Sequence, residues 1–369
     1  MQTACDEVIY SGFCERLQPC GRILEMDGWN VWCCSPIYGE DGKVHVFYSR
    51  WRNDFNFWVA DCEVGHAVAD HPEGPYTHVD VALQGRGGTA WDSWSIHNPT
   101  VHKVGNRYAL LYTGSNGSGL DITKADLPGM PWETYEPYFM RLVETKRIGL
   151  ALSDSLYGPW TRVADKQPLL DASPRPAWDD MLTTNPALLQ LPDGTFRLYY
   201  KSIDWKSWKE IFGIRRYGAA AAKRLEGPYV KYENNPVLNF EHFKPRFIAN
   251  KTVTVSKEKE YEFKTAQVED AYVWQENGTF RMICRDMGFF NHEYGLYFES
   301  ADGLNWTGTP QVAYRDAAFY FDEEMPGLAR EGRFERPQVL MKDGRPAYLF
   351  CAWRGGKYRT ASGVVLKIK

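Results

Sequence analysis

The sequence predicts an all-β fold, a single-domain five-bladed β-propeller that spans residues 1–369. Three observations predict it: one type of segment recurs five times, a tight-turn dipeptide interrupts each copy, and a glycine-centred phrase follows four of them. Repeats with a fixed pattern are typical of propellers and solenoids, in which each repeat is one supersecondary unit. Stretches with a helical period are scarce, which favours the all-β prediction.

The five segments share a polar start before a proline or alanine, an apolar strand, a glycine turn and an aromatic-rich strand. They read SPIYGEDGKVHVFYSRW from Ser35, NPTVHKVGNRYALLYTGS from Asn98, NPALLQLPDGTFRLYYKS from Asn185, DAYVWQENGTFRMICRDM from Asp270 and RPQVLMKDGRPAYLFCAW from Arg336. Asp-Gly, Gly-Asn or Asn-Gly separates the two apolar runs each time, and these dipeptides suit tight hairpins because the turn needs positive φ. Each segment therefore predicts the two inner strands of a blade.

A second phrase follows the hairpins and predicts the turn between the two outer strands of a blade. It reads ADHPEGPYTHV around Gly74, SDSLYGPWTRV around Gly158, AKRLEGPYVKY around Gly227 and SADGLNWTGTP around Gly303. The fifth hairpin lacks this phrase and runs into TASGVVLKIK. We therefore expect the N-terminal segment to supply the missing outer strand and to close the ring.

The blade cores are expected near residues 30–76, 92–160, 179–229, 268–308 and 333–369. The repeats begin about 60 to 90 residues apart, which is longer than a minimal blade needs, so long loops are expected on one face. The charged segment from about residue 243 to 267 is predicted to be an inserted loop or hairpin.

Composition excludes several classes of function. The net charge of −4 provides no basic footprint for nucleic acid, and no apolar run is long enough to span a membrane. No signal peptide is visible at the start of the chain, so the location stays open between the cytoplasm and, with a leader removed, the periplasm or the exterior. The eight cysteines form no Cys-x-x-Cys pair and no histidine cluster has zinc spacing, so no metal and no cofactor are predicted. The oligomeric state is not predicted.

In a propeller the first strand of each blade lines the central axis, so the starts of the five segments should form a ring at one mouth of the funnel. The positions just before the prolines, or before Ala271 in the fourth segment, are Ser35, Asn98, Asn185, Asp270 and Arg336, and the positions one residue earlier are Cys34, His97, Thr184, Glu269 and Glu335. Isolated charges there would be costly to desolvate, which favours a polar site. The alternative is a set of salt bridges between blades, for instance Arg336 with Asp270.

Two blades carry an additional Trp-Asp pair. Trp91 and Asp92 precede Asn98 by the same spacing at which Trp178 and Asp179 precede Asn185, and Asp27 is an approximate counterpart in the first blade. One interpretation is a loop-packing device that repeats. The other is a sugar site in which indole faces stack on the ring and carboxylates bind hydroxyls.

Charged residues also end the second strands, on the same side as the ring. They are Arg50, Lys201 and Arg285, and His292 follows in the next loop. Such residues are usually solvated. In this position they could instead hold an anionic substrate such as a uronic acid or a sulfated sugar.

The repeats and the phrase RIGLALSDSLYGPWTR resemble the five-bladed propeller glycoside hydrolases, over nearly the whole chain. These include the arabinanase and β-xylosidase group (family 43), the invertase and levansucrase groups (family 32 and relatives) and the anhydrogalactosidase group (family 117). The resemblance implies an Asp-Pro base in the first blade and a Glu acid two residues before a proline-like position. Glu269 and Glu335 match the acid, whereas Ser35-Pro36 and Asn98-Pro99 replace Asp-Pro.

The resemblance and the polar ring together predict a glycoside hydrolase that is exo-acting on a plant or algal oligosaccharide. The candidate catalytic residues are Glu269 and then Glu335 as acid, Asp92 or Asp179 as base, and His97 as a second possible acid. The candidate substrate contacts are Asp27, Arg50, Trp91, Trp178, Lys201, Asp270, Arg285, His292 and Arg336. The alternatives are a polysaccharide lyase that uses His97 with Arg50 and Arg285, a phosphorylase, and a propeller that binds glycans without turnover.

Overall fold

The computed structural model describes residues 7–52, 54–163, 166–246, 264–306, 308–323 and 332–369. The chain is mostly β, as predicted. Most of the loop or hairpin expected near residues 243–267 lies outside the described residues, because these omit 247–263. Within the described ranges, no helix is both long enough and apolar enough to cross a bilayer.

The strands that the structure describes form three four-stranded sheets and one eight-stranded sheet. The eight-stranded sheet consists of two antiparallel parts joined by the parallel pairing of Asn30 with Ala361, and each four-stranded sheet or part is called a unit below. The first is β2 (Trp29–Tyr38), β3 (Val44–Arg52), β4 (Glu63–Ala69) and β5 (Thr77–Leu83). The second is β6 (Ile96–Val104), β7 (Arg107–Gly114), β8 (Arg147–Ser153) and β9 (Thr161–Arg162). The third is β10 (Thr184–Gln190), β11 (Phe196–Ser202), β12 (Arg216–Ala222) and β13 (Val230–Lys231).

The fourth unit is β14 (Gln267–Glu276), β15 (Thr279–Met287), β16 (Gly295–Ser300) and β17 (Gln311–Tyr314). The fifth is β18 (Glu335–Lys342), β19 (Arg345–Gly355), β20 (Thr360–Ile368) and, from the other end of the chain, β1 (Leu17–Ile23). β1 pairs antiparallel with β20, so the N-terminal segment supplies the outer strand that the fifth repeat lacks.

The tight-turn dipeptides form the hairpins inside the units. Asn277 and Gly278 between β14 and β15 both have positive φ, at 52° and 80°, and Asp343 and Gly344 between β18 and β19 have 51° and 76°. Asn, Asp and Gly tolerate this conformation, and two consecutive residues of this kind match the twist of the flanking strands.

The units pack side by side through their faces. The inner strands contact one another in the order β2, β6, β10, β14, β18 and back to β2. A hydrophobic cluster lies between each pair of neighbours; Leu111 of β7 and Leu198 of β11, for example, share one cluster. Both faces of a central strand are therefore buried, which explains the nearly continuous apolar runs of the repeats.

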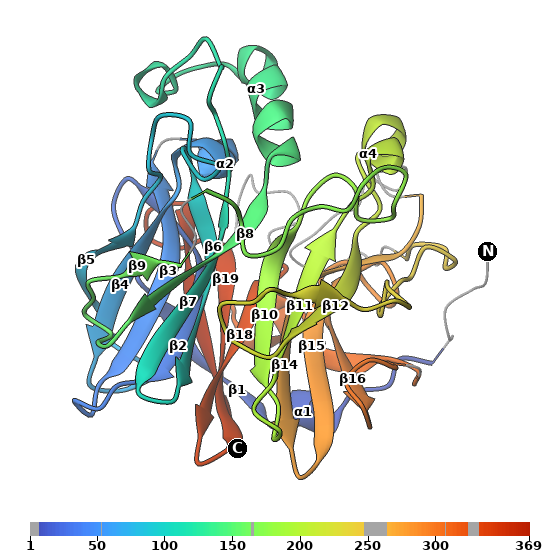
Figure 1. Ribbon diagram of the computed structural model, residues 1–369. Coiled ribbons are helices and arrows are strands. Elements are labelled where there is room, and N and C mark those ends of the chain that lie inside the picture. The colour runs from blue at the N-terminus through green and yellow to red at the C-terminus, as the bar shows by residue number, and fades with distance from the viewer. Residues whose placement is uncertain (1–6, 53, 164–165, 247–263, 307, 324–331) are drawn as a thin grey trace.

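The helices lie mainly at one end of the strands (Figure 1). They are α1 (Gly12–Glu15), η1 (Phe55–Phe57), α2 (Trp58–Asp61), η2 (Lys124–Asp126), α3 (Trp132–Glu144), α4 (Trp205–Ile211) and α6 (Ala317–Tyr320). α2, α3 and α4 follow the second strands of the first three units, and Figure 1 shows them together above the sheets. They therefore surround the same end at which the five inner strands begin.

Candidate functional site

Each inner strand carries a β-bulge at its start, and one residue of each bulge has left-handed backbone geometry. These residues are Cys33, Asn98, Asn185, Asp270 and Arg336, with φ between 50° and 62°. Asn and Asp adopt this geometry more readily than other non-glycine residues, whereas Cys and Arg do so at a cost in strain. The bulge turns the chain so that these five side chains meet on the inside of the strands.

A series of side-chain hydrogen bonds links the five bulge residues from Asn98 to Cys33. Asn98 Nδ2 donates to Asn185 Oδ1 at 2.7 Å, and Asn185 Nδ2 donates to Asp270 Oδ1 at 2.7 Å. Arg336 donates through Nη1 to Asp270 Oδ1 at 3.3 Å and through Nε to Cys33 Sγ at 3.2 Å. Cys33 Sγ contacts the carbonyl oxygen of Pro99, next to Asn98, at 3.3 Å.

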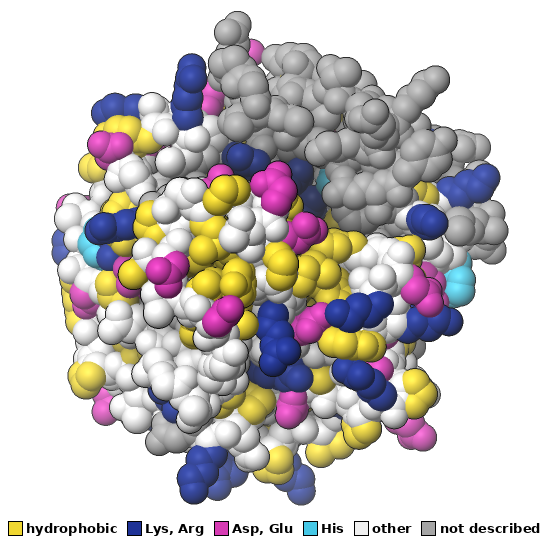
Figure 2. Space-filling model, turned by 90° about the horizontal axis from the view of Figure 1, so that it is seen from above, with side chains coloured by type: hydrophobic (Ala, Val, Ile, Leu, Met, Phe, Trp, Pro, Cys, Tyr) yellow, Lys and Arg dark blue, Asp and Glu magenta, His cyan; other side chains and the backbone are white. Residues whose placement is uncertain are grey.

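A cavity of about 250 Å³ lies above this series of hydrogen bonds. The residues that line it come from all five units; they are Trp32, Ser49, Trp51, Phe55, Trp58, Cys62, His97, Asn98, Lys146, Asn185, Lys201, Arg215, Glu269, Asp270, Arg285, Arg333, Glu335 and Arg336. Figure 2 views the molecule from this end, where hydrophobic side chains gather near the middle of the face among acidic and basic ones.

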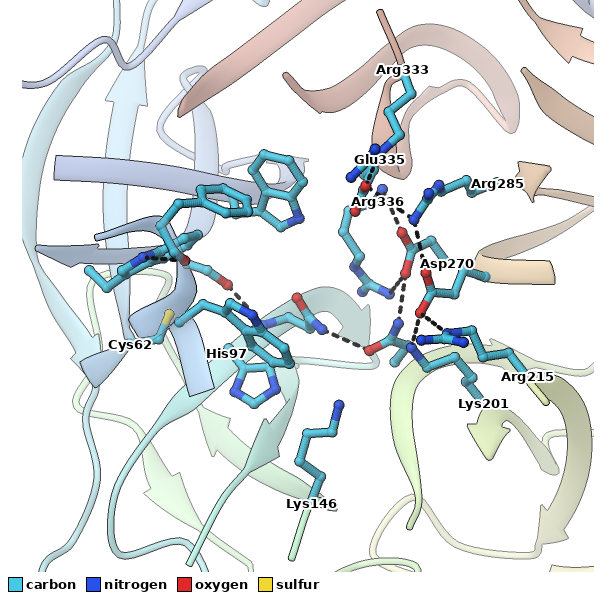
Figure 3. A pocket seen from close by; sticks show the side chains of 18 residues that line it. Cys62, His97, Lys146, Lys201, Arg215, Asp270, Arg285, Arg333, Glu335 and Arg336 are labelled. Carbon is cyan, nitrogen blue, oxygen red and sulfur yellow. Dashed lines mark hydrogen bonds and ion pairs between the residues drawn. The ribbon is translucent and has the colours of Figure 1, made fainter. Parts of the chain in front are cut away.

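The cavity has one aromatic wall and one charged wall. Trp32, Phe55 and Trp58 are half-buried rings on the aromatic wall, and the Phe55 ring packs edge-on against Trp32 at 5.3 Å between centroids. η1 and α2 position this wall, since they fold back over the end of β3. Figure 3 shows His97 and Cys62 on this side, opposite the labelled group Arg333, Glu335, Arg336, Arg285, Asp270, Arg215 and Lys201.

The charged wall contains Glu269 and Glu335, which share Arg285. Arg285 Nη1 lies 2.9 Å from Glu269 Oε2 and 3.1 Å from Glu335 Oε1. Glu269 also pairs with Lys201, and with Arg215 at 3.3 Å. Glu335 has a second cation in Arg333.

The surrounding cations decide the protonation of these carboxyls. Burial alone would raise the pKa of Glu269, but Lys201, Arg215 and Arg285 outweigh it and hold that pKa well below its usual range. Burial also raises the pKa of Glu335, but Arg285 and Arg333 outweigh burial and lower that pKa below its usual value. Both side chains are therefore carboxylates at neutral pH.

Across the cavity, His97 and Lys146 have the opposite electrostatic environment. Burial, and then Lys146, Arg336 and Lys201, hold the pKa of His97 well below its usual range, so its imidazole is neutral. Its Nδ1 lies 3.2 Å from Ser95 Oγ, and its buried Nε2 has no hydrogen-bond partner. Burial and then Lys201 also lower the pKa of Lys146 well below that of an ordinary lysine.

The structure brings together seven of the predicted site residues. Those that line the cavity are His97, Lys201, Glu269, Asp270, Arg285, Glu335 and Arg336. His292 lies behind them, with Nε2 at 3.5 Å from Arg285 Nη2. The expected salt bridge between Arg336 and Asp270 is also present, so that pair has a structural role as well.

Six predicted residues lie away from the cavity. Asp92 accepts hydrogen bonds from Tyr112 Oη and Arg162 Nε, both at 2.9 Å, and Asp179 accepts from Tyr200 Oη at 2.8 Å and Lys231 Nζ at 2.7 Å.

Trp91 stacks on Tyr112 and Trp178 on Tyr200, with ring centroids 5.9 Å and 5.8 Å apart. The duplicated Trp-Asp pair is thus the loop-packing device. Neither Asp92 nor Asp179 lines the cavity, and both carboxylates accept hydrogen bonds from their own unit, so the role of either as base stays a prediction that this cavity does not favour.

Asp27 and Arg50 are also misplaced relative to the prediction. Asp27 is exposed and does not line the cavity. Arg50 pairs with Glu63 at 2.8 Å and stacks over Trp29, 4.2 Å from the ring centroid. It therefore braces β3 against β4 from outside the funnel.

One member of the predicted ring is displaced by two residues. Strand register aligns Cys33, and not Ser35, with Asn98. The Pro36 that resembles the prolines of the other repeats follows the bulge instead of forming it. At the position where the resemblance implies an Asp-Pro base, the structure has Cys33 and Cys34.

Sequence reasoning did not predict eight cavity residues, namely Trp32, Ser49, Phe55, Trp58, Cys62, Lys146, Arg215 and Arg333. Lys146 and Arg215 occupy equivalent positions, each directly before the third strand of its unit. Extending the repeat alignment to the third strands would have found these two. Among the residues described, no group of three or more His, Cys, Asp or Glu is placed to hold a metal ion.

No protein-family model matches the chain, and no curated protein matches it in sequence. A family 117 glycoside hydrolase from the marine bacterium Zobellia galactanivorans superposes with a TM-score of 0.61 at 15% identity, over 96% of this chain and 91% of that one. A thermostable family 43 glycoside hydrolase gives 0.56 at 14% identity, over 94% of this chain and 95% of that one.

A family 43 β-xylosidase/α-arabinofuranosidase from a compost microbial metagenome, in complex with xylotriose, gives a TM-score of 0.54 at 16% identity, over 95% of this chain and 93% of that one. The chain therefore has the β-propeller fold of family 117 and family 43 glycoside hydrolases.

Proposed function

We propose that this propeller is a glycoside hydrolase that cleaves an oligosaccharide in the cavity at the start of its inner strands. The observation that carries the proposal is that two carboxylates, Glu269 and Glu335, face a wall of half-buried aromatic rings across one cavity. Aromatic faces bind the apolar faces of sugar rings, and glycoside cleavage needs an ionised group and a proton donor at the scissile bond.

The architecture supports this proposal. We infer that the five units are the blades of one closed ring and that β1 closes it by pairing with β20. The cyclic order of contacts among the inner strands supports a central axis, and the cavity then lies on that axis. Residues from every blade reach a funnel of this kind, as the lining residues do.

Within this proposal, Glu269 acts as the ionised carboxylate. It removes a proton from the attacking water, whose oxygen bonds to the anomeric carbon while the glycosidic bond breaks. The cations around Glu269 favour this role over the acid role predicted from the sequence. His97, on the other side of the cavity, is the candidate proton donor to the leaving oxygen only when bound substrate raises its low pKa and it takes up a proton, and Asp270 and Arg336 position the charged wall.

The size of the cavity supports action at a chain end. A volume of about 250 Å³ is smaller than pockets for drug-sized ligands, which hold about 300–1,000 Å³. One terminal sugar unit suits such a space better than the middle of a polymer. An exo-acting enzyme on short plant or algal oligosaccharides is therefore the form of the proposal that we favour.

The experiment is product analysis by chromatography and mass on a panel of plant and algal oligosaccharides. Wild type should release a monosaccharide one water heavier than its residue, and Glu269→Gln should abolish this release. Glu276→Gln is the matched control, because Glu276 lies on the same strand and pairs with Arg281 at 2.7 Å outside the cavity. Release that Glu269→Gln leaves unchanged would reject the assignment of Glu269.

A polysaccharide lyase is a second candidate, favoured by the neutral His97 beside the cations of the cavity. Its imidazole would take the proton from C5 of a uronate while the bond from C4 to the leaving oxygen breaks, and the cations would neutralise the uronate carboxylate. The product would then carry a double bond that absorbs near the ultraviolet edge and would contain no added water. The same chromatograms separate the two reactions.

A further inference from the structure

Lys146 lies buried in the cavity without an acidic partner among the described residues. Its side chain is 5% exposed, and its Nζ lies 4.9 Å from the ring centroid of Trp58. No described carboxylate lies within 4 Å of this amine, whereas Lys201 is paired with Glu269. Figure 3 shows the amine of Lys146 pointing toward the middle of the cavity with no dashed line.

The backbone holds Lys146 in this position. Its amide donates to Val143 O at 3.3 Å as α3 ends, and its carbonyl accepts from Thr183 N, next to the third unit, at 3.2 Å. These two bonds fix the backbone of Lys146 at the junction between α3 and β8. A buried amine in a fixed place needs a counter-charge or loses its proton.

Three further polar atoms at the cavity lack hydrogen-bond partners among the described atoms. They are Nη2 of Arg336, Nε2 of His97 and Nε of Arg285, and all three side chains are buried. Buried polar groups of folded proteins are nearly always paired, so several unpaired groups around one cavity indicate a missing polar ligand.

Positively charged residues outnumber negatively charged ones around the cavity. Among its described lining residues, six are Lys or Arg and three are Asp or Glu. The acidic residues lie on the β14 and β18 side, where they are paired. Lys146 lies outside these pairs, and its distance from solvent makes salt screening of its charge weak.

We propose that the substrate is an acidic saccharide whose carboxylate or sulfate group binds between Lys146, Lys201 and Arg336, beside His97. This inference rests on the proposed function and names the class of substrate for the same cavity. A neutral sugar would offer hydroxyls to the unpaired atoms but no charge to Lys146. A carboxylate or sulfate ester supplies both the charge and two or three acceptor oxygens.

The test measures binding by titration calorimetry for pairs of disaccharides that differ only in the acidic group. One pair is α-1,4-linked digalacturonate and galactobiose, and the other is a galactose disaccharide with and without one sulfate ester. The acidic member should bind at least tenfold more tightly to wild type. Lys146→Met should remove most of that preference, and thermal unfolding confirms that the variant is folded.

Lys103→Met is the matched control, because Lys103 is an exposed lysine at the far end of β6 that pairs with Glu40. It should keep the full preference for the acidic member. Equal binding of the two members by wild type, or an unchanged preference in Lys146→Met, would overturn the inference.

The two proposals fail separately. Cleavage of neutral oligosaccharides without an acidic preference would keep the hydrolase and reject the acidic substrate. Selective binding of acidic saccharides that are never cleaved would keep the acidic ligand and reject the hydrolase. Preference within the carboxylate pair or the sulfate pair identifies which acidic group the cavity selects.

Discussion

Arg336 donates from Nε to Sγ of Cys33 across 3.2 Å, and this contact joins the first and the last of the inner strands. Both residues have left-handed backbone geometry that neither residue type favours, with φ of 53° and 51°. The side-chain contact therefore stabilises two strained bulges at once. The Arg336 guanidinium therefore has two partners, because it also pairs with Asp270.

Cys33→Ala should lower the free energy of unfolding by about 1–3 kcal/mol, because it leaves Nε of a buried guanidinium unsatisfied. Cys33→Ser, which keeps an acceptor, should lower it less. Urea unfolding of the three proteins measures both effects. Cys351→Ala is the control, since Cys351 packs only in the hydrophobic core; an equal loss for Cys33→Ala and Cys351→Ala would contradict the role of the hydrogen bond.

Asp179→Asn should destabilise the protein without impairing turnover. The change removes the charge that faces Lys231 Nζ at 2.7 Å, and a loss of about 1–3 kcal/mol in unfolding free energy is expected. The cavity does not contain Asp179, so kcat at a temperature where the variant is folded should equal that of wild type. A large drop in kcat with unchanged stability would return Asp179 to the catalytic site.

His66 should make the protein sensitive to mild acid. Its ring stacks on Phe47 and His45, and burial together with His45 and His78 lowers its pKa to about 3. In the unfolded chain the pKa is about 6.5, so the unfolded state binds the extra proton and stability falls as the pH drops from 6.5 toward 3.

His66→Gln removes this proton linkage. Between pH 6.5 and pH 5 the variant should lose about 2 kcal/mol less unfolding free energy than wild type. Asp41 lies 3.1 Å from His45 and is present in both proteins, whereas Asp80 contacts His66 directly at 3.4 Å, so the comparison is made in an Asp80→Asn background. Parallel pH profiles for the two proteins would count against this assignment.

Trp58→Ala should raise KM about tenfold, because the variant loses a stacking face worth about 1–2 kcal/mol to the substrate. The indole packs edge-on against His97, with 5.1 Å between ring centroids, so a smaller decrease in kcat is also expected. Trp132→Ala is the control, as Trp132 is an exposed indole on α3 that does not line the cavity. Initial rates over a range of substrate concentrations separate the two parameters.

Binding of an acidic saccharide should take up protons through Lys146. Burial first, and then Lys201 and Arg215, lower the pKa of this amine in the empty cavity, while Glu269 and Asp270 oppose them. A bound carboxylate or sulfate raises that pKa again, so affinity should fall as the pH rises above the pKa of the empty state. Calorimetry in buffers of different ionisation enthalpy measures the uptake, and Lys146→Met should show less of it.

Much of the fold follows from local sequence signals. The dipeptides with positive φ locate the inner hairpins, and the missing fifth outer phrase correctly predicts that the N-terminal segment pairs with the last strand. The all-β class is confirmed, and the blade count stays a prediction. Pro36 misled the alignment of the first repeat, because a proline after the bulge looks like the prolines that lie within the bulges elsewhere.

The site was predicted less completely, for physical reasons. Equal spacing places Trp91 and Trp178 in equivalent positions, but spacing does not reveal depth along the blade, and their rings pack under the loops. Two rings of the aromatic wall, Phe55 and Trp58, come from a short segment that has no repeat counterpart. Lys146 stands next to Arg147, and only the strand register shows which of two adjacent cations faces the cavity.

The series of side-chain hydrogen bonds under the cavity also makes the shape of the cavity depend on the completion of folding. Its links join residues that are far apart in the sequence; Cys33 and Arg336 are separated by 303 positions. Contacts of such long range form late, because loop closure must come first. The floor of the cavity therefore forms only after both ends of the polypeptide have packed together. A nascent or clipped polypeptide contains Glu269 and Glu335 but does not hold them at a formed cavity.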